Sequence, residues 1–528
     1  MDFSAGPSAE TRKLEWIGVT PRQLAGFIAM VFGMFMAILD IQIVSASLSE
    51  IQAGLSASSD EIPWVQTAYL IAEVVMIPFS GFLARAFSTR TVFFTAAVGF
   101  TAASALCATA TSIDQMIVYR AIQGFIGGGM IPSVFAVAFT LFPRSKQSIV
   151  SPIIGLVATL APTIGPTIGG YLTDTYSWHW LFLINVIPGT IVAIAVFFVV
   201  DFDKPNYALL ERFDFVGLIG MALFLGSLEY VLEEGPRYDW FDDQTIATFG
   251  VLSVLGAIIF FWRAATAKEP IVELRAFRDR NFAFGSAFSF TMGIGLYGLT
   301  YVYPVYLAQV RGYDSLMIGN TMFVTGIAMF LTAPISGRLS AIVDPRIMML
   351  VGFMGFAVGT FLASGITPDW DFWELLIPQI LRGSSLMLCM VPITNLSLGT
   401  LPPDQIKNAS GLFNLTRNLG GAVGLAMINT ILNKRLDLHL ARLHEQVAWG
   451  HPAAEDQLAS MQQSFSNTMH ADGDMAALKK LAMLVRNQAN VLSFADLFLM
   501  LTILFASAAL FTLLMRKPAP VPAGAGGH

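Results

Sequence analysis

Long apolar stretches separated by short polar segments run along almost the whole chain. Each stretch is about 20 residues long, the length that an α-helix needs to cross the hydrocarbon core of a bilayer. Fourteen are recognisable, at residues 24–48, 63–84, 91–110, 114–139, 148–172, 179–200, 213–232, 245–265, 282–308, 316–337, 347–365, 372–397, 409–431 and 493–515. The pattern predicts an all-α polytopic membrane protein with fourteen transmembrane helices. We expect no removable signal peptide, because the polar N-terminus leads directly into the first long apolar stretch.

The composition supports the same class of protein. Hydrophobic residues make up 55% of the chain and charged residues only 12%, whereas soluble domains carry about 25% charged residues. A soluble protein of this length needs a charged surface, but a membrane protein exposes an apolar surface to lipid. The net charge of −6 gives no indication of nucleic-acid binding.

The distribution of basic residues predicts the orientation in the membrane. Cytoplasmic loops of membrane proteins carry an excess of Lys and Arg. With the N-terminus inside, 19 of the 30 basic residues lie in cytoplasmic segments, and the short outer loops contain only Arg237 and Arg311. We therefore expect both termini to be cytoplasmic.

An internal repeat divides the chain. The segment "PFSGFLARAFSTR" (Pro78 to Arg90) and the segment "PISGRLSAIVDPR" (Pro334 to Arg346) share five identities at a constant offset of 256 residues. Chance reuse of Gly and Pro in membrane helices is the alternative explanation. Two homologous bundles around a midplane site are typical of secondary transporters. The predicted organisation is a cytoplasmic N-terminus (1–23), an N-terminal six-helix bundle (24–201), two inserted helices with a cytoplasmic linker (202–281), a C-terminal six-helix bundle (282–515) that includes a periplasmic loop (432–492), and a disordered cytoplasmic tail (516–528).

Several short motifs carry a family resemblance. They are "LDIQIVSASL" from Leu39, "GFLARAFSTR" from Gly81, "YRAIQG" from Tyr119, "GLVATLAPTIGPTIGGYL" from Gly155 and "SWHWLFLINVIPG" from Ser177. Together they resemble the major facilitator superfamily, and more narrowly its fourteen-helix drug:proton antiporters of the EmrB/QacA type. The resemblance covers nearly the whole chain.

The resemblance implies a function and a location. It implies multidrug efflux across the bacterial inner membrane, driven by the proton-motive force, with amphipathic drug-like molecules as substrates, protons as the coupling ion and no cofactor. It also implies alternating access between two bundles embedded in membrane lipid. Relatives of the EmrB type work with a periplasmic adaptor (EmrA-like) and an outer-membrane channel, so the same partners are expected here.

Two sets of motif residues are expected to serve conformational change. The antiporter motif is matched by Gly165, Pro166, Gly169 and Gly170, where small residues permit close helix packing and the proline permits a kink. The gating loops of the two halves contribute Gly81, Arg85, Arg90, Gly337 and Arg346. Arg85 stands where the family has an aspartate, so the gating contact of that aspartate is not carried over.

Three ionisable residues lie inside predicted spans and are candidates for proton coupling. Asp40 lies about 10 Å from the outer end of the first helix and Arg120 about 9 Å from the outer end of the fourth, at 1.5 Å per residue. Opposite charges at matching depth predict an ion pair, which offsets part of the cost of burying each charge. Glu73, near the middle of the second helix, is the rival proton carrier. Each could instead be a buried structural group, but ionisable residues at such depth are usually functional.

Further polar residues inside the spans are expected to line a central substrate cavity together with Asp40. These are Gln42, Gln123, Asn185 and Arg382. Arg417 is interpreted as a structural partner. The three carboxylates near the end of the seventh helix, Glu229, Glu233 and Glu234, are interpreted as solvated groups at the outer surface.

The polar segment 432–492 has apolar residues at helical spacing. We expect short amphipathic helices that lie on the membrane or dock an adaptor. Its histidines, His439, His444, His451 and His470, lack the spacing of a metal site, so no metal is expected.

Alternative functions remain open from the sequence. The chain could export one specific metabolite or siderophore, import a solute, or act as a polytopic membrane enzyme. The antiporter motif argues against import. Neither a G-x-x-x-x-G-K-[ST] nucleotide loop nor an H-E-x-x-H metal motif is present, which argues against an ATP-driven pump or a metalloprotease and leaves an ion gradient, of protons or of sodium, as the energy source.

Overall fold

The computed structural model describes residues 14, 16–45, 47–58, 60–447, 452–469 and 473–515. Every regular element in this part of the chain is a helix, and thirteen helices are long and apolar enough to cross a membrane. The predicted all-α polytopic fold is therefore confirmed. The tail 516–528, most of the N-terminal segment 1–23, and His451 and His470 lie outside the described residues.

The N-terminal half contains six spanning segments, two of them interrupted. The fourth predicted span divides at Gly128 and Gly129, and the sixth divides at Ile184 and Asn185. The helices are α1 (Pro21–Ser45), the short α2 (Leu48–Leu55), α3 (Trp64–Phe87), α4 (Thr89–Ala108), α5 (Ile113–Gly127), α6 (Met130–Leu141), α7 (Gln147–Thr175), α8 (Trp180–Leu183) and α9 (Val186–Val199).

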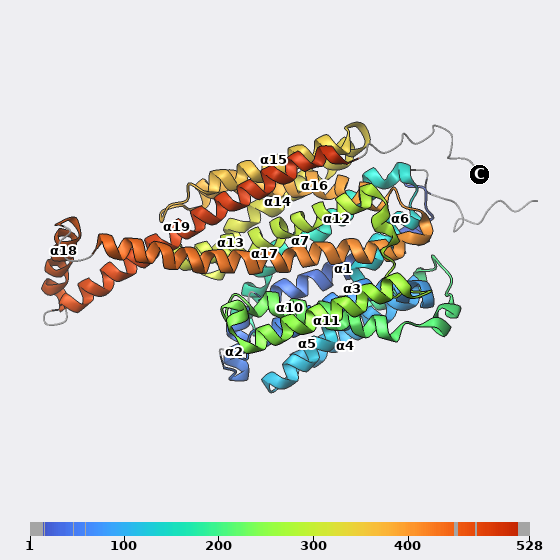
Figure 1. Cartoon of the computed structure of the whole chain (residues 1–528), viewed down its shortest axis with the longest axis horizontal. Helices are drawn as coiled ribbons and strands as arrows, with labels where there is room; N and C mark the ends of the chain where they lie inside the picture. Colours follow the sequence, from blue (N-terminus) through green and yellow to red (C-terminus); the bar gives the residue numbers. More distant parts are fainter. Residues whose placement is uncertain are drawn as a thin grey trace, which may run out of the picture.

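The inserted pair consists of α10 (Phe215–Glu234) and α11 (Gln244–Thr266). The two helices pack against each other, and α10 also packs against α3. They therefore lie beside the N-terminal half, as Figure 1 shows.

The C-terminal half begins with a span that alternates between α and π geometry. It comprises α12 (Arg280–Gly293), η5 (Ile294–Gly298), α13 (Leu299–Tyr306) and η6 (Leu307–Arg311). The remaining helices are α14 (Ser315–Ile342), α15 (Pro345–Ala363), α16 (Phe372–Leu398), α17 (Pro403–Gln446), α18 (Pro452–Met469) and α19 (Gly473–Phe511).

Aspartates start many of these helices. The side chains of Asp214, Asp243, Asp279, Asp314 and Asp344 each accept a hydrogen bond from a backbone N–H of the first helical turn. Such caps satisfy donors that the helix itself leaves free, and they place a negative charge at the positive end of the helix dipole. Short polar loops with a capping residue thus separate the apolar spans.

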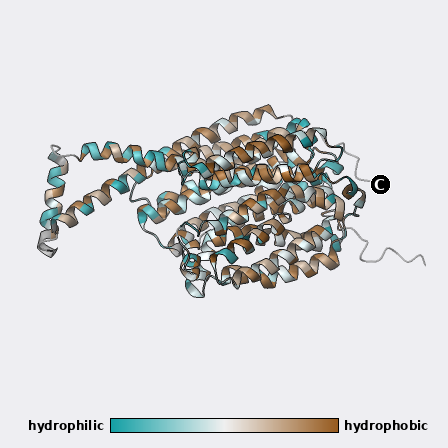
Figure 2. Ribbon diagram, turned by 60° about the horizontal axis from the view of Figure 1, so that its bottom comes forward, coloured by the Kyte–Doolittle hydropathy of each residue, from teal (hydrophilic) through white to brown (hydrophobic). Residues whose placement is uncertain are grey.

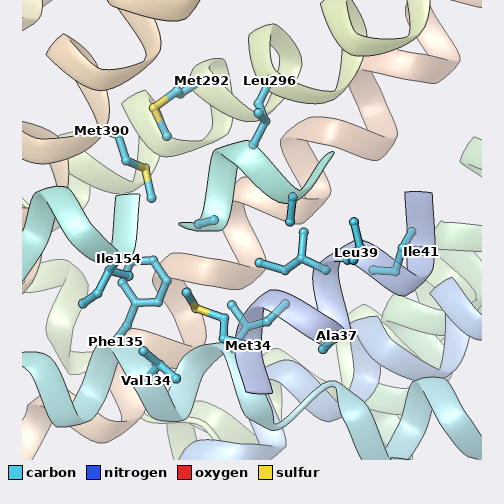
Figure 3. Close-up of a cluster of buried hydrophobic side chains, with 14 of the residues drawn as sticks. Met34, Ala37, Leu39, Ile41, Val134, Phe135, Ile154, Met292, Leu296 and Met390 are labelled. Atoms are coloured by element: carbon cyan, nitrogen blue, oxygen red, sulfur yellow. The ribbon is translucent and has the colours of Figure 1, made fainter. Parts of the chain in front are cut away.

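Several pairs of helices join the halves, among them α6 with α17 and α7 with α16. Helix α3 packs against α17, and α7 packs against α14. Glycines permit the approach: a Cβ on Gly81 of α3 would lie 2.9 Å from the carbonyl oxygen of Lys407, and one on Gly337 of α14 would lie 2.5 Å from that of Ser148. Side chains from both halves also meet in a buried apolar cluster that includes Met34, Phe135 and Ile154 on one side and Met292 and Met390 on the other (Figure 3).

The segment after the thirteenth predicted span differs from the prediction. Instead of short helices lying on the membrane, α17 continues unbroken for 44 residues and α19 for 39. Both extend beyond the bundle, with α18 at the far end (Figure 1), and the extension is markedly more hydrophilic than the bundle (Figure 2). The two long helices pack against each other. The predicted span 409–431 lies within α17, which is not among the thirteen apolar helices because residues such as Asn414 and Arg417 make it polar.

Candidate functional site

Asp40 and Arg120 form an ion pair in the interior of the N-terminal half. Arg120 Nη1 lies 2.6 Å from Asp40 Oδ2, and both side chains are fully buried. The other carboxylate oxygen of Asp40 accepts hydrogen bonds from the amide groups of Asn185 at 2.7 Å and Gln123 at 3.1 Å. The carboxylate therefore has three side-chain donors, which offset the cost of burying a charge.

The surroundings of Arg120 hold the pair in place. Its Nε donates to the carbonyl oxygen of Val65, and its guanidinium carbon lies 4.2 Å from the centre of the Tyr69 ring. Gln123 accepts a hydrogen bond from Arg120 at 2.6 Å and donates another to Ser104 at 2.7 Å. One polar network thus joins residues of α1, α3, α4, α5 and the α8–α9 junction.

A cavity of about 480 Å³ lies next to this network, between the two halves. Its volume is in the range of drug-sized binding sites. The lining residues are Ile41, Gln42, Ser45, Gln66, Leu70, Glu73, Val74, Pro166, Glu229, Leu232, Glu233, Tyr297, Thr300, Tyr301, Pro304, Val305, Ala308, Ile318, Asn418, Gly421, Ala422, Leu425, Ala426 and Asn429. On α1 the apolar cluster of Figure 3 adjoins the cavity, since Ile41 belongs to both, and the cavity occupies the half of the molecule predicted to face outward.

Of the residues predicted to line the substrate cavity, the structure places one in the cavity wall. Gln42 lines the cavity, but Asp40, Gln123 and Asn185 do not, because their polar atoms are used within the buried network behind the wall. Arg382 is 1% exposed and also lies behind the wall, where it donates to the hydroxyl of Thr300, a lining residue.

Glu73 is the predicted proton carrier that does reach the cavity. It is 2% exposed, and its Oε1 has no hydrogen-bond partner among the described residues. The charges of Arg120 and Arg417, one from each half, both act on it. Glu73 is thus within electrostatic range of two buried guanidinium groups, and its Oε1 remains a free acceptor among the described residues.

Two carboxylates of the site were missed by sequence reasoning. Glu229 and Glu233 on α10 line the cavity, and Glu229 is only 5% exposed. The interpretation of Glu229 and Glu234 as solvated groups is wrong, because α10 packs against α3 and α17 and buries them. Glu234 accepts a hydrogen bond from Thr67. The available signal was the spacing of four residues between Glu229 and Glu233, which places both on one helix face.

The antiporter motif lies where α7 meets α1. A Cβ on Gly165 would come within 2.4 Å of Gln42 Cβ, and one on Gly169 within 2.8 Å of the carbonyl oxygen of Ile43. Pro166 lines the cavity and Gly170 is buried. The small residues therefore set the distance between α7 and the helix that carries Asp40.

Only some of the predicted gating residues connect the two halves. Gly81 and Gly337 lie at the contacts described above, and Arg85 forms an ion pair of 2.8 Å with Glu273 in the segment before α12. Arg90 instead packs over the ring of Phe197 within its own half, and Arg346 pairs with the neighbouring Asp344. A second ion pair, between Lys407 and Asp203, lies beside the first at Gly81. These contacts close the end of the molecule that is predicted to be cytoplasmic.

Reversing the charge of Arg85 is expected to weaken this closure. The Arg85–Glu273 pair is about one-fifth exposed, so the variant R85E should shift the conformational equilibrium by about 1–2 kcal/mol, by losing the attraction and adding a repulsion. Transport rates of R85E, E273R and the charge-swapped double variant R85E/E273R measure this shift. The swap should restore the rate, and R90E, in the first turn of α4, should behave as the unmodified protein. A swap no better than the single variants would contradict the role of the pair.

The sequence matches a protein family and is similar to several named proteins. A sequence profile described as Major Facilitator Superfamily matches residues 30–425. The chain is 42% identical to the colistin resistance protein EmrB of Acinetobacter baumannii, over 95% of this chain and 98% of that protein. It is 29% identical to the multidrug export protein EmrB of Escherichia coli, over 95% and 96% of the two chains.

Solved structures share the fold at low sequence identity. The human organic anion transporter MFSD10 superposes with a TM-score of 0.58 at 13% identity, covering 92% of this chain and all of that one. The proton:xylose symporter XylE superposes with a TM-score of 0.58 at 12% identity, over 93% and 95% of the two chains.

Proposed function

This chain belongs to the major facilitator superfamily, among the EmrB-type transporters of the bacterial inner membrane, and we propose that it exports amphipathic drug-like molecules in exchange for protons. It is a multi-pass transporter rather than an enzyme. The observation that carries the proposal is the cavity between the two halves, with Glu73 in its wall and the Asp40–Arg120 pair directly behind it. Ionisable groups beside a cavity at membrane depth are the usual elements of proton relays.

The proposed exchange of drug for protons depends on Glu73 and Asp40 alternating between a protonated and a deprotonated state. In the state with the outer half accessible, a drug leaves the cavity and Glu73 accepts a proton through its free oxygen. The halves then rock, the contacts at Gly81 and Arg85 open, and the proton leaves to the cytoplasm before the next drug enters. Asp40 joins the relay when movement of α1 against α5 separates it from Arg120. Both carboxylates are accordingly proposed as proton carriers.

We also propose that the extension formed by α17, α18 and α19 contacts a periplasmic adaptor protein that leads to an outer-membrane channel. The extension exposes apolar side chains within an otherwise hydrophilic surface: Met475 is 72% exposed, Met483 56% and Leu478 53%. Exposed apolar groups on a polar element are typical of a surface that binds another protein.

Dye uptake into inverted membrane vesicles tests the export. We expect vesicles that contain the protein to accumulate an amphipathic dye when a proton gradient is imposed, and to release it when a protonophore collapses the gradient. Accumulation that persists without a proton gradient but requires a sodium gradient would contradict proton coupling. Absence of accumulation under either gradient would contradict drug export itself.

A further inference from the structure

The wall of the central cavity carries an unusual excess of negative charge. Three carboxylates line it, Glu73 from α3 and Glu229 and Glu233 from α10, and none of its described lining residues is basic. Glu229 lies within electrostatic range of both Glu73 and Glu233. Like charges grouped in a largely desolvated space are unfavourable unless a positive charge joins them.

Two buried acceptors in the same wall also lack donors. Among the described residues, neither Glu73 Oε1 nor Gln66 Oε1 has a hydrogen-bond partner, although Glu73 is 2% and Gln66 9% exposed. Buried polar atoms are nearly always paired, so unpaired ones that line a cavity point to a ligand that supplies the missing interaction. Both orphans are acceptors, which a positively charged or N–H-bearing ligand satisfies and an anion does not.

The buried arginines do not supply this charge. Arg120 is paired with Asp40, Arg382 donates to Thr300, and Arg417 donates to Asn414 at 2.6 Å. All three lie behind the lining rather than in it. The charges of Arg120 and Arg417 act on Glu73. The charged neighbours of Glu229 and Glu233, in contrast, are other carboxylates.

Most of the remaining lining is apolar or aromatic, and its other polar side chains are the neutral ones of Gln42, Ser45, Gln66, Thr300, Asn418 and Asn429. Leu70, Leu232 and Leu425 provide apolar surface, and Tyr297 and Tyr301 provide rings. A cation gains from aromatic faces as well as from carboxylates. The combination fits a lipophilic organic cation, whose diffuse charge faces the glutamates while its apolar groups face the leucines and tyrosines.

We propose that the cavity selects lipophilic organic cations, and that Glu229 and Glu233 on the inserted helix α10 determine this selectivity. The inference rests on the proposed export function, because it assigns the substrate class of the same cavity. It also gives the inserted pair α10–α11 a role: α10 supplies two of the three acidic groups that contact the substrate.

Binding of two hydrophobic ions of equal shape and opposite charge tests the proposal. The full-length protein in detergent is titrated with tetraphenylphosphonium and with tetraphenylborate, and the ratio of the two affinities is the readout. We expect the unmodified protein to prefer the cation. The double variant E229Q/E233Q should lower this ratio about 30-fold or more, since removing buried charge partners has effects of that size.

Glu234 provides the matched control. It lies next to Glu233 on α10 and is buried, but it binds Thr67 and does not line the cavity. E234Q should therefore keep the ratio of the unmodified protein. If the double variant does not fold, the affinity ratios of the single variants E229Q and E233Q are compared with that of E234Q instead.

The failures of the two proposals differ. Equal affinity for both ions in the unmodified protein, an unchanged ratio in E229Q/E233Q, or a loss in E234Q as large as in E229Q/E233Q would overturn the cation selectivity. Those results leave gradient-driven dye accumulation untouched. Loss of that accumulation in vesicles would overturn the export function instead.

Discussion

Replacing Arg120 by glutamine is expected to abolish proton-driven export and to lower the free energy of unfolding by about 3–5 kcal/mol. The substitution leaves Asp40, which is fully buried, without its cationic partner. Asn185 and Gln123 still donate to the carboxylate, but two neutral amides do not replace a guanidinium at 2.6 Å. Thermal unfolding in detergent measures the stability, and dye accumulation in vesicles measures the export.

The double variant D40N/R120Q separates a structural role from a coupling role. It removes both charges and keeps hydrogen-bonding groups, so we expect it to recover most of the lost stability, since neutral replacements of a buried pair are often tolerated. Export should remain absent. Recovery of export together with stability would show that the pair is structural only.

Arg382 offers the matched control in the other half. It is buried like Arg120, yet its partner is the hydroxyl of Thr300 rather than a carboxylate. R382Q should therefore destabilise the protein much less than R120Q, because no buried carboxylate loses its counter-charge. Equal losses in the two variants would mean that packing, not charge pairing, explains the effect at Arg120.

Replacing Glu73 by glutamine is expected to lower the maximal accumulation of drug about 50-fold for each 100 mV of membrane potential. One proton crossing 100 mV supplies about 2.3 kcal/mol, and this free energy corresponds to about a 50-fold concentration ratio. Glutamine keeps the shape of the side chain but cannot carry a proton. Exchange of labelled for unlabelled drug without a gradient should continue, since this exchange needs no net proton transfer.

Glu61 is the control for this experiment. It lies in the loop before α3, where the backbone N–H and the hydroxyl of Ser58 donate to it at 2.9 Å, and these hydrogen bonds hold its pKa below the ordinary value. E61Q changes the same chemical group on a neighbouring segment but outside the cavity, so accumulation should not change. Accumulation by E73Q at the level of the unmodified protein would exclude Glu73 as the proton carrier and leave Asp40 as the candidate.

Local sequence patterns predicted the residues whose position follows from depth along a single helix. Asp40 and Arg120 were expected to meet because each lies a similar distance from the outer end of its span, and they do form an ion pair. Gly165 and Gly169 were expected to permit close helix packing, and both lie against α1. Such predictions succeed because the bilayer fixes the length and direction of each helix, so residue number converts to depth.

Sequence patterns gave wrong predictions where the packing of a helix against its neighbours decides whether a side chain is buried, faces the cavity or finds a partner. The sequence predicted a solvated end for α10. The helix instead packs against α3 and α17, and Glu229 and Glu233 line the cavity. Arg382 was assigned to the cavity by depth alone, whereas its rotation places it behind Thr300. Arg85 occupies an acidic position of the family motif, and only the fold brings Glu273 to it.

The sequence by itself therefore determined that the chain is a polytopic helical transporter, and it predicted how far along its helix each charge lies. Hydrophobicity and span length are properties of each segment and need no partner. Beyond the Asp40–Arg120 pair, the tertiary structure alone decided which charges pair, which face the cavity and that α17 and α19 continue beyond the bundle. Those outcomes depend on the rotation of each helix and on its neighbours, because the free energy of a buried charge is set by groups that lie far away in the sequence.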